Sequence, residues 1–154
     1  MNWNVRYAVL AAVLLLFASI VPAFADEFFE EDGVAIRGYD PIAYFAEMKP
    51  VKGSAEFRAE YQGSTFHFSS VSNRDTFRAD PDKFAPQYGG YCAFGLAKVY
   101  KAAIDPAAFT VVDSKLYLNY SKTVRSKWKS DIPGYIRKAD ENWPDVRKLT
   151  KVHE

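Results

Sequence analysis

The sequence predicts an α+β fold, a small antiparallel sheet of hairpins with several short helices packed on it and a C-terminal helical segment. Three observations predict it. Apolar and polar residues alternate around short turns, as in β-hairpins. Asp-Pro pairs recur, as at helix starts, and apolar residues near the C-terminus recur at helical spacing. No internal repeat is visible in the sequence. We therefore expect an acidic lead-in at 26–33, one domain at 34–146 and a frayed polar tail at 147–154.

The first 25 residues have the pattern of a cleavable secretory signal peptide. Arg6 is the only charged residue before Asp26, and the apolar run Ala8–Val21 ends at a proline. Ala23-Phe24-Ala25 then supplies the small residues that a signal peptidase accepts, so we expect cleavage between Ala25 and Asp26. A membrane-spanning helix needs about 20 apolar residues, and this run is shorter. We therefore expect a periplasmic or secreted protein with no stable membrane span after cleavage.

Cleavage changes the charge of the chain. Removing 25 of the 154 residues leaves 129, and it removes one of the 20 Lys and Arg residues but none of the 19 Asp and Glu residues. The mature chain is therefore neutral when its His residues are neutral, and it lacks the basic surplus that nucleic-acid binding requires. The lone cysteine, Cys92, cannot form an internal disulfide, so an aromatic-rich core must supply the stability.

Short helices are expected where aspartate precedes proline. Asp40-Pro41 has the pattern of an N-cap followed by proline in the first turn, which predicts a helix through Phe45. The same pair predicts helices after Asp80-Pro81 and Asp105-Pro106. Before the first of these helices, Val34–Arg37 is expected to be a short strand.

A first hairpin is expected from Glu56–Tyr61 and Thr65–Ser69, which flank a Gln-Gly-Ser turn. Because side chains alternate along a strand, His67 should lie on the face opposite Phe66 and Phe68. This hairpin should expose His67 on its polar face.

The segments after this hairpin are expected to be helical, except for a second hairpin. Ser72, followed by an acidic residue three positions later, predicts a helix start. The second hairpin is predicted at Phe109–Val112 and Leu116–Tyr120. Helical spacing then runs from Lys122 to about Lys138, with an interruption at Pro133-Gly134.

Taken in order, several motifs resemble the YHS-domain family. The core motifs are YQGSTFHFSS and FRADPDKF, and the opening Asp-Pro pair also matches. Further stretches are similar to an exported, single-domain bacterial branch of the family, so the resemblance covers nearly the whole chain after residue 25. The stretches that carry it are Gly38–Phe45, Tyr61–Ser70, Phe77–Phe84, Tyr88–Phe94, Leu118–Tyr120 and Asn142–Pro144.

The resemblance implies a metal-linked accessory role, because YHS domains occur beside copper-transporting modules with cysteines as the suspected ligands. This chain has Ala43, Ser69 and Asn73 where the family pattern can have cysteine. Copper and zinc bind thiolate and imidazole ligands. The remaining soft pair, Cys92 and His67, is therefore the expected Cu or Zn site of a non-catalytic binding or sensing module.

Two alternatives remain open. A tyrosine- and glycine-rich surface could bind a small ligand or a protein without any metal, through stacked rings. Less expected is a thiol-reactive role for Cys92, which requires a lowered thiol pKa. The sequence contains no hydrolase, zinc-protease or phosphate-loop motif, so we expect no enzyme activity. The tyrosine- and glycine-rich stretch comprises Tyr39, Tyr44, Tyr88, Gly89, Gly90 and Tyr91.

Overall fold

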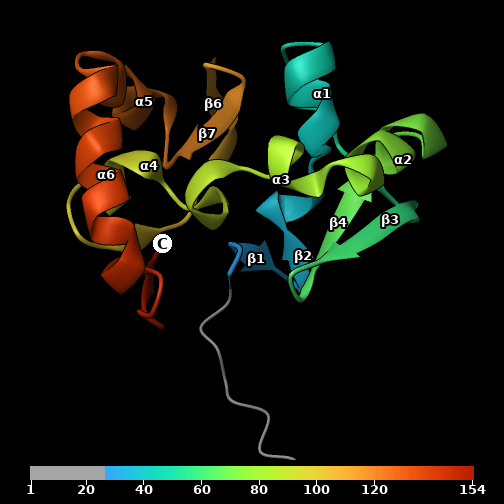
Figure 1. The fold of residues 1–154 in the computed structure, drawn as a ribbon, viewed down its shortest axis with the longest axis horizontal. Coiled ribbons are helices and arrows are strands. Elements are labelled where there is room, and N and C mark those ends of the chain that lie inside the picture. Colours follow the sequence, from blue (N-terminus) through green and yellow to red (C-terminus); the bar gives the residue numbers. More distant parts are fainter. Residues whose placement is uncertain (1–26) are drawn as a thin grey trace, which may run out of the picture.

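The structure is a computed structural model that describes residues 27–154, and its fold is α+β, as the sequence predicts. The predicted signal peptide, with Ala23, Ala25 and Asp26 at its cleavage site, lies outside the described residues. The described elements fall into two halves that lie side by side in Figure 1. Helices α1 to α3 accompany the four-stranded sheet of the N-terminal half, and helices α4 to α6 accompany the hairpin of the C-terminal half.

The N-terminal half is built on a four-stranded sheet in the order β1-β2-β4-β3. Strands β3 and β4 form an antiparallel hairpin, and β2 runs parallel to β4. The elements are β1 (Glu30–Glu31), β2 (Val34–Ala35), the 3-10 turn η1 (Ile36–Gly38), α1 (Pro41–Ala46), β3 (Ser54–Tyr61), β4 (Ser64–Phe68), α2 (Val71–Ala79) and α3 (Pro81–Phe84).

The C-terminal half contains a second hairpin, β6-β7, and a two-stranded parallel pair, β5-β8. Three helices accompany them, of which α6 is the longest with 15 residues. The elements are the 3-10 turn η2 (Gln87–Gly90), α4 (Ala93–Leu96), β5 (Lys101–Ala102), β6 (Asp105–Val112), β7 (Lys115–Asn119), α5 (Lys122–Lys129), α6 (Ile132–Val146) and β8 (Val152–His153).

Alternation and aspartate caps correctly predict the first half. Phe66 and Phe68 are fully buried in β4, while His67 between them is half-buried on the other face. Asp40 caps α1, because its Oδ1 accepts a hydrogen bond from the Ile42 backbone N–H at 2.8 Å. Asp80 precedes α3 as expected, although its side chain makes no capping hydrogen bond.

Three local predictions are wrong. Asp105 begins β6 rather than a helix, because its backbone pairs with Asn119 and its carboxylate instead closes a turn with the Ala107 N–H at 2.8 Å. Helix α2 is capped by Ser70 rather than Ser72. The C-terminal helical segment breaks at Asp131, whose carboxylate caps α6, so Pro133 and Gly134 lie in the first turn of α6.

The C-terminal tail forms a strand instead of fraying. Strand β8 pairs in parallel with β5, and the Ala103 N–H donates to the His153 carbonyl at 2.9 Å. This pairing gives hydrogen-bond partners to backbone groups at the edge of β5. It also brings His153 toward Cys92, because the Cys92 N–H donates to the carbonyl of Ala102, the β5 residue paired with His153, at 3.1 Å.

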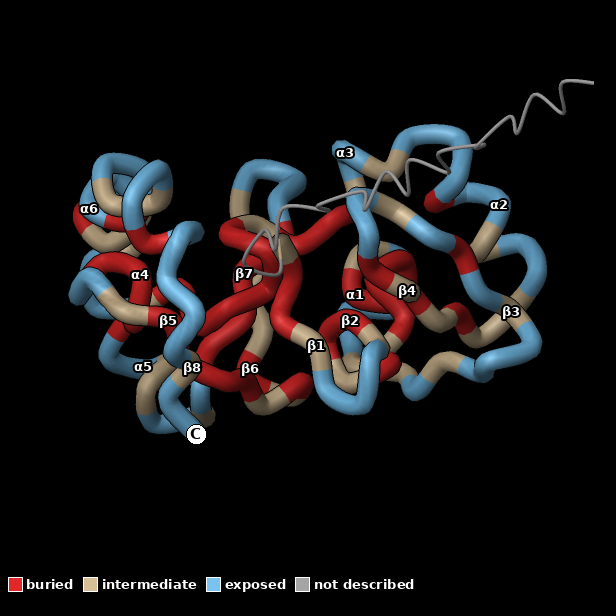
Figure 2. The backbone as a smooth tube through the Cα atoms, turned by 90° about the horizontal axis from the view of Figure 1, so that it is seen from below, coloured by how far each residue is buried: buried red, intermediate tan, exposed pale blue. Residues whose placement is uncertain are grey.

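One aromatic-rich core extends through both halves, as the composition predicts. Figure 2 shows the buried segments along the inner parts of both halves, with exposed backbone on the outside. Trp128 is fully buried and packs on Tyr117 in the C-terminal half, and Phe77 packs on Phe66 in the N-terminal half. Within 27–154, none of the helices has the length and apolar character needed to cross a membrane.

Candidate functional site

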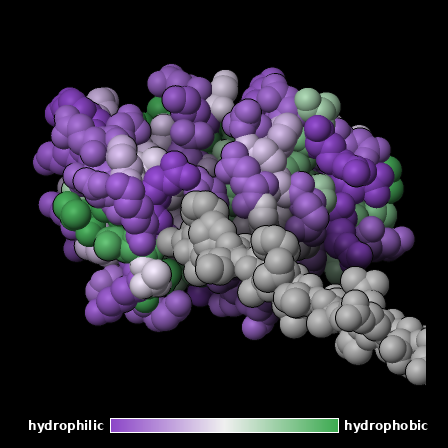
Figure 3. All heavy atoms as spheres, turned by 60° about the horizontal axis from the view of Figure 1, so that its bottom comes forward, coloured by the Kyte–Doolittle hydropathy of each residue, from purple (hydrophilic) through white to green (hydrophobic). Residues whose placement is uncertain are grey.

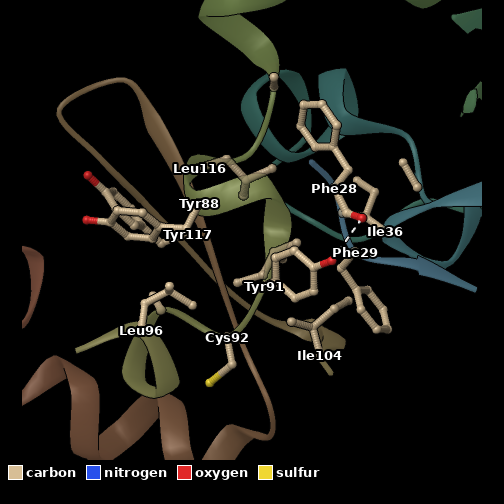
Figure 4. Close-up of a cluster of buried hydrophobic side chains, with 14 of the residues drawn as sticks. Phe28, Phe29, Ile36, Tyr88, Tyr91, Cys92, Leu96, Ile104, Leu116 and Tyr117 are labelled. Carbon is tan, nitrogen blue, oxygen red and sulfur yellow. Dashed lines mark hydrogen bonds between the residues drawn. The ribbon is translucent and has the colours of Figure 1, made fainter. Parts of the chain in front are cut away.

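Cys92 lies just before α4, between two strands of the C-terminal half. Its backbone forms a bridge to Leu118 of β7 on one side, and its N–H donates to the Ala102 carbonyl of β5 on the other. Only 1% of the residue is exposed. In Figure 4 its sulfur points away from the ring of Tyr91. The local fold therefore holds the thiol in a fixed position inside the C-terminal half.

A pocket of about 490 Å³ opens next to Cys92. This size falls in the range of about 300–1,000 Å³ that small-molecule sites usually have. Aromatic and aliphatic side chains make most of its wall, and Lys127 of α5 completes it together with two residues at the chain end. The lining residues are Cys92, Phe94, Tyr100, Ala102, Tyr120, Val124, Lys127, His153 and Glu154. We call this cavity the Cys92 pocket.

The Cys92 thiol is held in its protonated form. Burial raises its pKa, and this outweighs the backbone N–H groups of Gly95, Tyr120 and Phe94, which act in the opposite direction. The thiol lies 3.7 Å from Asn119 Oδ1, to which it donates. Thiol chemistry needs a lowered pKa and an accessible sulfur, and Cys92 has neither.

His67 does not meet Cys92, so the predicted shared metal site is not formed. His67 lies on β4 opposite Arg58 and near Lys52, in the half of the molecule that does not contain α4 (Figures 1 and 2). Burial, then Lys52 and Arg58, lowers its pKa below the usual value. Alternation correctly placed His67 on the polar face, but nothing in the sequence indicated that the two residues belong to separate halves.

Two of the three positions that the resemblance associates with cysteine, Ser69 and Asn73, come together in a hydrogen-bond network. Asp40 Oδ2 accepts from the Ser69 N–H at 2.8 Å, from Ser69 Oγ at 2.7 Å and from Asn73 Nδ2 at 2.7 Å. Ala43 contributes no polar side chain. Within 27–154, no group of three or more His, Cys, Asp or Glu side chains could hold a metal ion. The donors present therefore do not fit a tight copper or zinc site.

The predicted tyrosine- and glycine-rich surface is not a surface. Five of its six residues are buried, and only Tyr39 is partly exposed. The buried hydroxyls have partners within the protein: Tyr44 donates to the Pro106 carbonyl at 2.9 Å, and Tyr88 donates to Asp140 at 2.8 Å. Gly89 has a φ of +61°, and a Cβ there would lie 1.9 Å from the Glu27 carbonyl oxygen. Tyr39, Tyr44, Tyr88, Gly89, Gly90 and Tyr91 therefore shape the core rather than a binding face.

Few large apolar side chains of residues 27–154 are exposed. Figure 3 shows a mostly hydrophilic face, with hydrophobic atoms at its left edge over the C-terminal half and others near its top and right edge. The large exposed apolar residues of the described chain are Met48, Val71, Val99, Tyr120 and Leu149, and of these Tyr120 lines the Cys92 pocket.

Sequence reasoning missed most residues of the pocket. His153 was assigned to a frayed tail, and only the β5-β8 pairing brings it beside Tyr100, whose ring centroid lies 5.2 Å from that of His153. Tyr120 and Val124 flank a strand end and a helix start, which no local pattern marks as a site. The available signal was Cys92 itself, two residues after Gly89-Gly90.

The fold defines a small α+β protein. The YHS domain family matches residues 42–88, so the chain contains a YHS domain there. The match runs from α1 into η2 and ends before the Cys92 pocket. Neither a curated protein nor a solved structure matches the chain at a significant level.

Proposed function

We propose that this protein is an exported, non-catalytic binding module that holds a small aromatic molecule in the Cys92 pocket. The observation that carries the proposal is the pocket itself, a cavity of about 490 Å³ beside a rigidly held, protonated thiol. Phe94, Tyr100 and Tyr120 offer three rings against which a planar molecule can stack.

The rim of the pocket favours a ligand with a single negative charge. The Lys127 ammonium lies at the rim and would pair with one anionic substituent. The Glu154 carboxylate lines the same pocket and would repel a second one. An aromatic ring system that bears one carboxylate or sulfonate therefore matches the pocket in shape and charge.

A ligand role fits the donors better than a metal role does. The two soft donors that the sequence suggested lie in different halves, and the Asp40 network already satisfies the polar groups at the other candidate position. The Cys92–His153 pair supplies only two soft donors to the pocket, short of the three or four that tight Zn binding uses.

Export to the periplasm or outside the cell is part of the proposal. It rests on the N-terminal sequence pattern, in which a positive end, an apolar run and small residues precede Asp26. N-terminal sequencing of the protein recovered from the producing cells should begin at Asp26. A chain that retains residues 1–25 and stays in the cytoplasm would contradict this part.

Calorimetric titration with anilinonaphthalene sulfonate, which has aromatic rings and one sulfonate, tests the ligand site. Val124→Phe fills the pocket from its wall and should weaken binding of the probe at least about tenfold, or about 1.4 kcal/mol. The matched control is Val71→Phe, which makes the same change at an exposed helix position and should leave binding unchanged. The proposal is wrong if the wild type does not bind the probe or if Val124→Phe binds it normally.

A further inference from the structure

We infer that the C-terminal half is a second, diverged copy of the YHS unit, and that the Cys92 pocket is the open counterpart of the filled Asp40 site. The first line of support is the register of the two hairpins. Each paired residue of β6-β7 has the number of its β3-β4 counterpart plus 51, as in 54 and 105 or 68 and 119. Both registers have an irregularity between the first and second pairs. The matching pairs are Ser54↔Phe68 and Asp105↔Asn119, Arg58↔His67 and Phe109↔Leu118, and Tyr61↔Ser64 and Val112↔Lys115.

The helix that follows each hairpin begins in the same way. Ser70 caps α2 by accepting from the N–H three residues later at 3.1 Å, and Ser121 caps α5 by the same bond at 3.1 Å. The next helix in each copy follows an aspartate with nearly identical dihedral angles, φ −153° and ψ 71° at Asp80, φ −153° and ψ 67° at Asp131. All of these positions keep the separation of 51 residues.

The buried ring pair is also repeated. Phe66 and Phe77 have centroids 5.0 Å apart at an interplanar angle of 33°. Their counterparts, Tyr117 and Trp128, lie 5.3 Å apart at 36°. In both copies this pair fixes the capped helix on the inner face of its hairpin.

The segment before each hairpin matches with a separation of 52 residues. Three successive positive φ angles, 44°, 57° and 70°, occur at 36–38, and 53°, 61° and 75° occur at 88–90. A residue with an N-cap role follows two positions later, Asp40 in the first copy and Cys92 in the second. The N–H of Asp40 donates to the Val51 carbonyl at 2.9 Å, and that of Cys92 donates to the Ala102 carbonyl at 3.1 Å. Three successive positive-φ positions followed by an N-cap position, repeated in the same order, are unexpected unless the halves share one architecture.

This correspondence identifies the Cys92 pocket as the counterpart of the Asp40 site. The Asp40 carboxylate is surrounded by Ile42, Ser69 and Asn73, each of which donates to it. Their counterparts in the second copy all line the pocket. The corresponding pairs are Asp40 and Cys92, Ile42 and Phe94, Ser69 and Tyr120, and Asn73 and Val124.

The residue differences between the two copies explain why the Asp40 site is filled and the Cys92 pocket is open. In the first copy, a carboxylate meets a hydroxyl and an amide donor, so the protein satisfies its own site. In the second copy, a thiol replaces the carboxylate, and Val124 offers an isopropyl group in place of the Asn73 amide. Tyr120 replaces the short hydroxyl of Ser69 with a ring whose own hydroxyl is at the far end of the side chain. The ligand group that contacts the Cys92 sulfur, the Tyr120 ring and the Val124 isopropyl group must therefore be apolar, and any charged group of the ligand must point to the rim. This assignment rests on the proposed ligand function and specifies how the ligand lies in the pocket.

A cycle of substitutions in the mature chain tests the correspondence without any ligand. Cys92→Asp alone should lower Tm, because a buried carboxylate there would face the Asn119 amide oxygen instead of the hydroxyl and amide donors that surround Asp40. Tyr120→Ser with Val124→Asn should also lower Tm. The triple variant should recover at least half of the Tm lost by Cys92→Asp, because the Asp40 network is rebuilt. A triple variant no more stable than Cys92→Asp would overturn the correspondence.

Probe binding separates this inference from the proposed function. The triple variant should bind anilinonaphthalene sulfonate at least about tenfold more weakly than the wild type, because its own side chains fill the site. If the triple variant recovers stability but the wild type does not bind the probe, the duplication holds and the ligand function is wrong. If the wild type binds but the stability cycle shows no recovery, the pocket is a site but not the counterpart of the Asp40 site.

Discussion

Replacing Asp40 by alanine is the sharpest test of whether the Asp40 hydrogen-bond network stabilises the N-terminal half. The carboxylate is fully buried and accepts four hydrogen bonds, one at the N-cap of α1 and three from Ser69 and Asn73. Losing an N-cap acceptor costs about 1 kcal/mol. Losing a hydrogen bond to a charged group costs about 1.5–3 kcal/mol.

The bonds do not add fully, because two of the donors can still serve each other. Asn73 Nδ2 already lies 3.2 Å from Ser69 Oγ, so these side chains stay paired when the carboxylate is removed. Counting the cap and one charged bond, Asp40→Ala should lower the free energy of unfolding by about 3 kcal/mol. For a domain of this size, that loss corresponds to a fall in Tm of about 10 °C.

Urea unfolding at neutral pH measures this loss. Asp40→Asn keeps the volume and one carbonyl oxygen for the cap but turns an amide toward the donors, so it should lose about 2 kcal/mol. Asp75→Ala changes an exposed carboxylate on α2 that pairs only with Arg74 at the surface, and it should lose no more than about 0.5 kcal/mol. A loss below about 1 kcal/mol for Asp40→Ala would refute the view that this network holds α1, β4 and α2 together.

Three further results are expected. Trp128→Ala should cost about 4 kcal/mol in urea unfolding and Phe77→Ala a similar amount, since each fills the same core position of its copy; a loss under about 1.5 kcal/mol for either would contradict this. Cys92 should resist a thiol reagent in the native protein at neutral pH, and deleting residues 150–154, which removes β8, should speed its labelling at least about tenfold; rapid labelling of the intact protein would show that burial does not protect the thiol. Because the folded-state pKa of His67 is lowered, the unfolded chain binds more protons, so stability should fall as the pH drops through about 6.5. Urea unfolding at about pH 7.5 and about pH 5.5 should show this fall, and His67→Gln should reduce it; an unchanged difference in the variant would assign it to other groups.

Local chemistry made parts of the fold predictable from the sequence. Alternation predicted both hairpins, because side chains of a strand alternate between a buried and an exposed face. Asp40 and Asp80 marked helix starts, because the residue before a helix must supply an acceptor or an extended conformation. The same Asp-Pro signal failed at Asp105, where pairing with Asn119 outweighed local preference.

The repeat could not be found in the sequence, because its two copies share architecture but few residues. At a separation of 51, the matching pairs Ser70 and Ser121, Arg74 and Arg125, and Asp80 and Asp131 are identical. The packed rings of Phe66 and Phe77 are kept only as aromatic, in Tyr117 and Trp128. Caps and ring packing tolerate such changes, because they require a hydroxyl acceptor or a ring of suitable size rather than one residue type.

The sequence by itself therefore determined the α+β class, the hairpins, the first capped helices and the resemblance to YHS domains. The family model supports that resemblance at residues 42–88. Only the tertiary structure decided which residues form the candidate site. Cys92 and His67 were linked by their chemistry, but they lie in separate halves, whereas Cys92 and His153 share a pocket because the chain end pairs with β5. Short-range patterns specify local backbone conformation, while a site is assembled by long-range contacts that no local pattern encodes.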